Sequence, residues 1–183
     1  MDIRFNGKRA LVTGAGKGIG RDIAKALVKG GAKTVAISRT EADLASLKTE
    51  CPEIETCCVD LSDWSKARVA VEALGHFDLL VNNAGVSRVG PFLDVKEEDI
   101  DLCNQTFQIC NYHFYSKIHN FFILAQVVAK SMVAKKSGGS IVNLSSAASK
   151  QALQDHAVYC STKGAVDSLT SVMALELGPH KVR

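Results

Sequence analysis

Residues 9–20 of the chain read RALVTGAGKGIG, a short apolar run that ends in a cluster of glycines. The apolar part, 9–13, has the length of a buried strand, and a helical pattern follows from about Gly18 to Lys29. Glycines such as Gly14, Gly18 and Gly20 let the backbone approach a pyrophosphate, which then sits on the N-terminus of the next helix. A tight strand-to-helix connection would also use glycine, but the position between first strand and first helix predicts nucleotide binding.

Strands and helices keep alternating after this turn. We expect strands at 34–38, 54–59 and 77–81, and helices at 42–50 and 63–74. Short apolar strands that alternate with helices of about a dozen residues are typical of a parallel sheet covered on both faces. The sequence therefore predicts an α/β fold, a Rossmann-like doubly wound parallel sheet in a single domain over residues 1–183.

Composition narrows the class of protein. With 183 residues, of which 46% are hydrophobic and 22% charged, the chain matches an ordinary globular domain. A net charge of +3 without a basic cluster argues against a nucleic-acid partner. The longest apolar run, 121–129, is far short of the ~20 residues of a membrane span. Six cysteines show no metal spacing and no disulfide framework, and the N-terminus has no apolar signal region. We expect no metal site and a cytoplasmic protein with reduced thiols.

The end of the second strand indicates which dinucleotide is bound. An NAD site places Asp or Glu there for the ribose hydroxyl, whereas an arginine accommodates the 2′-phosphate of NADP. The chain has Arg39 at this point, in the run Ser38-Arg39-Thr40, and Lys17 is available from the glycine-rich turn. Either cation could be a solvated surface charge, as most are. Together they favour NADP(H).

Tyr159 and Lys163 are candidate catalytic residues. They are four residues apart in a helical stretch, which puts them on one face. A phenol titrates near ~10, and a neighbouring positive charge lowers that value, so the phenol can exchange a proton near neutral pH. Ser146 precedes the tyrosine by 13 residues, at the end of the apolar run 141–144. A tyrosine, a lysine and a serine hydroxyl can together polarise and protonate a carbonyl.

In order, these motifs resemble those of the short-chain dehydrogenase/reductase family, over about residues 4–103 and 124–183. The matching elements are the glycines at 14, 18 and 20, the run Asn82-Asn83-Ala84-Gly85, Ser146, and Tyr159-x-x-x-Lys163. The resemblance implies an NADPH-dependent oxidoreductase that reduces a carbonyl substrate, a ketose such as L-xylulose or a small α-dicarbonyl.

The resemblance also implies roles for individual residues. Tyr159 donates the proton, and Ser146 binds the substrate oxygen. Lys163 lowers the pKa of the Tyr159 phenol and holds the nicotinamide ribose. Asp60 contacts the adenine and Asn82 lines the cofactor cleft. His156, one helical turn before the tyrosine, either faces the substrate or is a capping or surface histidine. The expected cofactor-binding residues are Gly14, Lys17, Gly18, Ile19, Gly20, Arg39, Asp60, Leu61, Asn82, Tyr159 and Lys163.

Residues 104–122 depart from the family pattern. The segment is rich in aromatic residues and makes the chain longer than the family pattern between Asn82 and Ser146. The family's long helix here carries an asparagine that anchors a water in the proton relay. Asn111 is the nearest match for that asparagine, with Asn104 and Asn120 as alternatives.

The second departure is that the chain ends at Arg183, where family members begin a sixth strand. We therefore expect a domain that lacks the family's last strands, with an exposed sheet edge and a less firmly fixed nicotinamide. Reduced or absent turnover follows from this expectation. The alternatives to an active reductase are a truncated, non-catalytic isoform that at most binds nucleotide or pairs with full-length subunits, and a nucleotide-binding regulator. Family members commonly form homotetramers, and the altered 104–122 segment makes that assembly doubtful for this chain.

Overall fold

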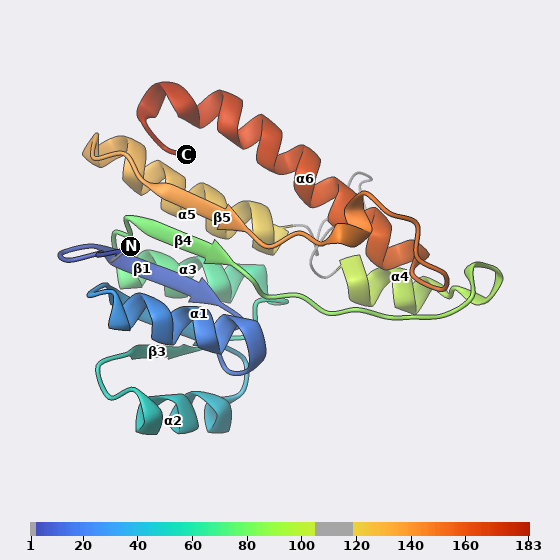
Figure 1. The fold of residues 1–183 in the computed structure, drawn as a ribbon, viewed down its shortest axis with the longest axis horizontal. Helices are drawn as coiled ribbons and strands as arrows, with labels where there is room; N and C mark the ends of the chain where they lie inside the picture. Colours follow the sequence, from blue (N-terminus) through green and yellow to red (C-terminus); the bar gives the residue numbers. More distant parts are fainter. Residues whose placement is uncertain (1–2, 105–118) are drawn as a thin grey trace.

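The computed structural model describes residues 3–104 and 119–183 of the chain. Parallel strands alternate with helices along the chain, as the sequence predicts (Figure 1). The strands are β1 (Arg9–Thr13), β2 (Lys33–Ser38), β3 (Glu55–Cys58), β4 (Leu79–Asn82) and β5 (Ser140–Asn143). The helices are α1 (Gly18–Lys29), α2 (Glu41–Glu50), α3 (Trp64–Leu74), α4 (Glu97–Asn104), α5 (His119–Lys135) and α6 (Ala157–Leu177). Short 3-10 turns are η1 (Phe92–Asp94), η2 (Ala147–Ser149) and η3 (Gly178–His180).

The strands form one sheet in the order β3-β2-β1-β4-β5, and every pair in it is parallel. Leu11 on the central strand β1 lies beside Val35 of β2 on one side and Leu80 of β4 on the other. After η3, Val182 forms a parallel bridge to Gly139, so these residues run beside the start of β5. Along the chain, β1, β2 and β3 extend the sheet in one direction, and the chain then crosses to the other side of β1 to add β4 and β5. This is the doubly wound pattern.

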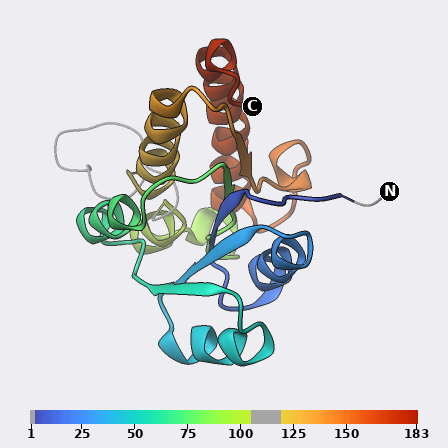
Figure 2. The same ribbon diagram turned by 90° about the vertical axis from the view of Figure 1, so that its left-hand side faces the viewer.

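Two apolar layers cover the two faces of the sheet. On one face, α1 and α2 pack over β1 and β2 through fully buried side chains such as Ala24, Leu44 and Leu47. On the other face, α3 and α5 pack over the same strands through Val71 and Leu124, and α6 adds side chains at the margin of this layer. Figure 2 shows α1 and α3 on opposite sides of the sheet. The predicted α/β fold is therefore confirmed.

Because all the strands are parallel, their carboxyl ends lie at one edge of the sheet, and the loops that carry the candidate residues leave from that edge. The loop after β3 ends at Asp63, the N-cap of α3, whose side chain accepts a hydrogen bond from the Lys66 amide at 3.1 Å. The expected relay residue Asn111 lies outside the described residues. None of the helices in the described part of the chain is long and apolar enough to cross a membrane.

Candidate active site

A cavity of about 390 Å³ opens at the carboxyl ends of the strands. It is bounded by the glycine-rich turn after β1 and by the loops after β2, β3 and β4, with Leu124 of α5 as a further wall. Seven of the predicted cofactor-binding residues line it. They are Gly14, Lys17, Ile19, Arg39, Asp60, Leu61 and Asn82.

The glycine-rich turn is packed tightly on one side and open on the other. Gly14 has φ +64°, and a Cβ on it would lie 2.8 Å from Cα of Ala84. A Cβ on Gly20 would lie 2.4 Å from the side-chain nitrogen of Asn83. Gly18 also has a positive φ, +57°, but a Cβ there would meet no atom within 4 Å. The first two glycines are thus required by packing, while Gly18 leaves free space beside its backbone.

Asn83 and Thr13 tie this turn to the end of β4. The Thr13 hydroxyl accepts hydrogen bonds from the amides of Asn83 and Ala84, both at 3.0 Å. The side-chain amide of Asn83 donates to the carbonyl oxygens of Thr13 at 3.0 Å and of Gly14 at 3.2 Å. These contacts join residues about 70 positions apart in the chain and satisfy buried polar groups that would otherwise be left unpaired. The turn therefore has a fixed position relative to the cavity.

Lys17 and Arg39 both line the cavity and are both exposed. Among the described residues, neither has a side-chain hydrogen bond or an ion pair. Arg21 and Lys25 nearby differ, because both bind the Glu50 carboxylate, at 2.7 Å and 3.0 Å. The lining also includes the carboxylates of Asp43 and Asp60, but neither forms an ion pair with Lys17 or Arg39 among the described residues, so both cations stay available to negative charge on a ligand.

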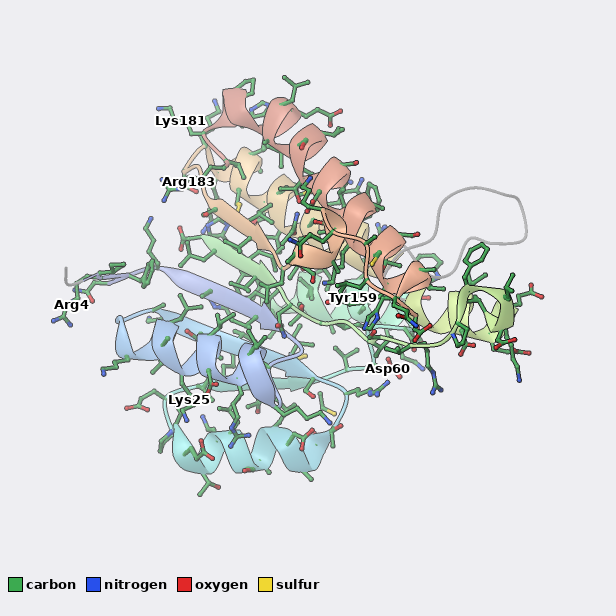
Figure 3. The ribbon with its side chains drawn as sticks, turned by 45° about the vertical axis from the view of Figure 1, so that its right-hand side comes forward. Arg4, Lys25, Asp60, Tyr159, Lys181 and Arg183 are labelled. Carbon is green, nitrogen blue, oxygen red and sulfur yellow. The ribbon has the colours of Figure 1, made fainter. Side chains whose placement is uncertain are left out.

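Asp60 and Leu61 belong to the loop after β3 and line the same cavity as the glycine-rich turn. One carboxylate oxygen of Asp60 accepts a hydrogen bond from the Ser62 amide at 2.9 Å, which fixes the side chain within its own loop. The neighbouring Val59 amide donates to the Ser38 carbonyl at 3.0 Å, so this loop stays beside the end of β2. Figure 3 shows Asp60 and Tyr159 at the same end of the sheet, on different elements.

Asn82 is buried at the end of β4, with 2% of its surface exposed. Its side-chain amide donates to the Asn143 side chain at 3.0 Å, and Asn143 in turn donates to the Thr170 hydroxyl at 3.0 Å. This chain of hydrogen bonds joins β4, β5 and α6. It connects the cavity wall to the helix that carries Tyr159 and Lys163.

Tyr159 and Lys163 both lie on α6, one turn apart, as their spacing predicts. The Lys163 ammonium lies 5.8 Å from the centroid of the Tyr159 ring and donates a hydrogen bond to the Leu144 carbonyl at 2.6 Å. Burial lowers the pKa of the Lys163 ammonium, and the nearby Asp167 carboxylate partly opposes that shift. The lysine therefore bridges α6 and the end of β5.

Ser146 is the N-cap of the short turn η2, three residues after the end of β5. Its hydroxyl accepts a hydrogen bond from the Ala148 amide at 3.1 Å, so its own hydrogen stays available for another acceptor. Asp167, four residues after Lys163 on α6, forms an ion pair with Lys150 at the end of η2. The Ser145 and Ser149 hydroxyls and the Lys150 ammonium together hold the pKa of the Asp167 carboxyl at about 2, and Lys150 lies 3.0 Å from it.

His156 directly precedes α6 but does not cap it with its side chain. Its ring nitrogen Nδ1 lies 2.6 Å from the Gln154 carbonyl oxygen. The ring centroids of His156 and Tyr159 are 6.3 Å apart, in an edge-to-face arrangement. His156 thus occupies the N-cap position of α6 without a side-chain cap hydrogen bond, and its ring lies beside the tyrosine; contact with the substrate stays a prediction.

The candidate site residues thus lie at one edge of the sheet, but they form two groups. The first group lines the cavity, and the second, made of Ser146, His156, Tyr159 and Lys163, lies around η2 and the start of α6, outside the cavity lining. In the described ranges, 3–104 and 119–183, no three His, Cys, Asp or Glu side chains gather as a metal site would require.

Comparison with known proteins identifies the family. A family model described as short chain dehydrogenase matches residues 8–183. The chain belongs to the short-chain dehydrogenase family. It is 54% identical to D-erythrulose reductase from Gallus gallus and 52% identical to L-xylulose reductase from Bos taurus. All of this chain is covered in both comparisons, and 70% and 71% of the relatives' lengths, respectively.

A solved structure supports the same assignment. It is a gluconate 5-dehydrogenase from Burkholderia cenocepacia in complex with NADP and tartrate, and it superposes with a TM-score of 0.86 at 30% identity. The superposition covers all of this chain and 70% of that one. The chain is therefore an oxidoreductase of the short-chain dehydrogenase/reductase type.

The residues that are present fit a nicotinamide dinucleotide, the cofactor type of this family. The open space beside Gly18 at the start of α1 adjoins the lining residues Lys17 and Ile19 and suits a pyrophosphate, although Gly18 and Gly20 are not themselves part of the cavity lining. Lys17 and Arg39 suit further negative charge. Sequence reasoning missed the positioning roles of Asn83 and Asp167. A signal existed for both, since Asn83 stands in the motif after β4 and Asp167 follows Lys163 at helical spacing. Leu124 gave no signal beyond its place in an apolar run.

Proposed function

We propose that this short-chain dehydrogenase is an NADPH-dependent carbonyl reductase that acts on a ketose or a small α-dicarbonyl, with the reduction of L-xylulose to xylitol as the first candidate reaction. The observation that carries the proposal is the Tyr159–Lys163 pair on α6, with Ser146 in the loop after β5 and the cavity with its glycine-rich turn at the same edge of the sheet. Each of these residue types has a defined task in carbonyl reduction.

The proposed chemistry uses the hydrogen-bonding capacity of the three side chains. When bound, NADPH supplies the hydride that reduces the carbonyl carbon. The Tyr159 hydroxyl donates a proton to the carbonyl oxygen, and the Ser146 hydroxyl donates a hydrogen bond to the same oxygen. Lys163 has three donors, of which one is used by Leu144, so two remain for the nicotinamide ribose. Its positive charge beside the tyrosine ring favours the phenolate that forms.

The preference for NADPH rests on Lys17 and Arg39. A 2′-phosphate adds negative charge at the adenosine ribose. In this fold the residue at the end of β2 contacts the 2′ position of that ribose. Here the position holds an arginine, and the glycine-rich turn brings a lysine to the same cavity wall. The structural neighbour with bound NADP supports this choice of cofactor. On this reading, Asp60 and Leu61 form the adenine side of the cavity.

The choice of substrate rests on the relatives together with His156. The two relatives named above are reductases of D-erythrulose and of L-xylulose, and both of these sugars are ketoses. A polyhydroxylated substrate needs hydrogen-bonding groups around its reacting carbon, and the His156 ring beside Tyr159 provides one. Asn111 remains the candidate for the relay asparagine.

A second candidate function is nucleotide binding without turnover, alone or paired with other subunits. It is favoured by one observation, that the cavity is lined by the nucleotide-side residues and that Tyr159, Lys163 and Ser146 lie outside its lining. Hydride transfer depends strongly on the placement of the nicotinamide, so a site that holds only the adenosine half would bind cofactor without reacting.

The deciding experiment is NADPH oxidation by the purified chain with L-xylulose, run beside Tyr159→Phe. The phenylalanine variant keeps the ring and removes only the proton donor. Turnover by the wild type that disappears in the variant, while NADPH binding is retained, supports the reductase. NADPH binding without turnover by the wild type supports the second candidate instead. Turnover that survives in the variant contradicts the role of Tyr159.

A further inference from the structure

Arg21, in the first turns of α1, connects the glycine-rich turn to α2. Its side chain is 14% exposed, and its guanidinium makes four polar contacts. One terminal nitrogen donates to the Gly16 carbonyl at 2.9 Å and to the Asp43 carbonyl at 3.2 Å. The other donates to the Ser46 hydroxyl at 3.0 Å and to the Glu50 carboxylate at 2.7 Å. The planar, five-donor guanidinium can hold all of these at once.

The two segments joined by Arg21 are those that carry the two cavity cations. Gly16 immediately precedes Lys17 in the glycine-rich turn, and Asp43 lies in the first turn of α2, shortly after Arg39. The segments are in close contact. A Cβ on Gly16 would lie 2.6 Å from the Ser38 hydroxyl and 2.9 Å from Cβ of Asp43. The Gly16 backbone thus packs against the side chains of Ser38 and Asp43, and Arg21 adds hydrogen bonds to the Gly16 and Asp43 carbonyls across the same contact.

Arg21 itself is not placed to serve as a ligand for an anion in the cavity. It is absent from the cavity lining, and its charge is directed at Glu50. The Arg21 guanidinium, and then Lys25, lower the pKa of the Glu50 carboxyl. Lys25, one turn later on α1, shares this carboxylate at 3.0 Å, and Figure 3 labels it on α1. Its ammonium contacts no atom of the glycine-rich turn among the hydrogen bonds of the described residues.

We propose that Arg21 is a positioning residue for cofactor choice: by holding Gly16 against α2, it keeps Lys17 and Arg39 at the spacing that a 2′-phosphate bridges. The inference rests on the proposed NADPH function and extends it to a residue that does not touch the cofactor. A ligand without the 2′-phosphate does not bridge the two cations. The arrangement should therefore matter for NADPH and much less for NADH.

The test measures the affinities of the purified chain for NADPH and NADH by titration calorimetry at one ionic strength. Arg21→Lys keeps a positive charge for Glu50 but replaces the fork by a point charge, which cannot reach both carbonyls and Glu50 together. We expect the NADPH-to-NADH affinity ratio to fall about tenfold, equivalent to ~1.4 kcal/mol. Lys25→Met is the matched control, because it removes the other Glu50 partner without touching the turn, and it should leave the ratio unchanged.

A double-mutant cycle separates positioning from general destabilisation. If Arg21 acts through the cations, Arg21→Lys should have no further effect on the ratio once Arg39→Gln has removed one of them. An effect of the same size in both backgrounds would overturn the inference, as would an unchanged ratio in Arg21→Lys or an equal loss in Lys25→Met. A wild-type chain that does not prefer NADPH would overturn the proposed cofactor and this inference with it. A wild type that prefers NADPH, with Arg21→Lys unaltered, would leave the proposed function standing and refute only the role of Arg21.

Discussion

Replacing the glycines of the turn by alanine should separate packing from ligand binding. Gly14 and Gly18 both have positive φ, +64° and +57°, so alanine at either position adopts a left-handed backbone conformation. That conformation costs ~1–2 kcal/mol for a residue with a Cβ. The two positions differ in what the new methyl group meets. At Gly14 it would lie 2.8 Å from Cα of Ala84, whereas at Gly18 it would meet nothing within 4 Å.

The contact at Gly14 adds a second cost. The neighbouring atoms are backbone atoms of Ala84 and the Asn83 side chain, which is held by its own hydrogen bonds, so the structure has little freedom to yield. Forcing a methyl group into such a site costs a further ~1–3 kcal/mol. We therefore expect Gly14→Ala to lower the free energy of unfolding by ~2–5 kcal/mol and Gly18→Ala by only ~1–2 kcal/mol.

Chemical denaturation of the two variants and the wild type measures this difference, and thermal unfolding checks it. At this chain length each ~1 kcal/mol corresponds to roughly 2–4 °C in Tm. Added NADPH provides the second measurement. Gly18→Ala should lose most of the stabilisation that NADPH gives the wild type, because the methyl group would occupy the space proposed for the pyrophosphate. Equal destabilisation by the two substitutions would refute the packing argument, and full NADPH stabilisation of Gly18→Ala would refute the assignment of that space.

Two pH-dependent effects should also be measurable. Burial lowers the pKa of His76 below its ordinary value of 6.5, and the Asp78 carboxylate partly opposes that shift. As the pH falls, the unfolded chain therefore binds a proton at His76 before the folded chain does. The free energy of unfolding should thus fall as the pH drops through 6.5. His76→Asn should show a shallower fall in urea denaturation over that range, and an unchanged slope would contradict the assignment. The pKa of Asp167 is about 2 instead of 3.8, so its contribution is present above pH 3.8 and is lost as the pH falls toward 2. Asp167→Asn should thus be less stable than the wild type at neutral pH, and this difference in the free energy of unfolding should become smaller in acid. A difference that does not change with pH would contradict the assignment of the stabilisation to the ionised Asp167 carboxylate.

Much of the fold could be predicted from the sequence because its signals are local. The strand at Arg9–Thr13 and the helix at Gly18–Lys29 have the predicted bounds, since an apolar run, a glycine cluster and a helical pattern follow one another directly. The other strands and helices up to β4 differ from the prediction by no more than two residues at either end. The Tyr159–Lys163 pair could be placed on one helix face for the same reason, because four residues span about one turn.

The positioning contacts could not be predicted in this way. Asn83 holds the glycine-rich turn through atoms of Thr13, 70 positions earlier in the chain, and the amide chain from Asn82 to Asn143 spans 61 positions. No periodicity of the sequence encodes such pairs, because they depend on which strands become neighbours in the sheet.

By itself, the sequence determined that this chain is a parallel α/β domain with a glycine-rich dinucleotide turn and a Tyr-x-x-x-Lys pair, because backbone conformation and helical spacing depend on residues close together in the chain. Only the tertiary structure decided how Asn83 fixes the turn, how Arg21 joins it to α2, and that Asp167 of α6 pairs with Lys150 after η2. It also decided that the cavity is lined by the nucleotide-side residues. The physical reason is that hydrogen bonds and close packing act over a few ångströms in space, whatever the separation along the chain.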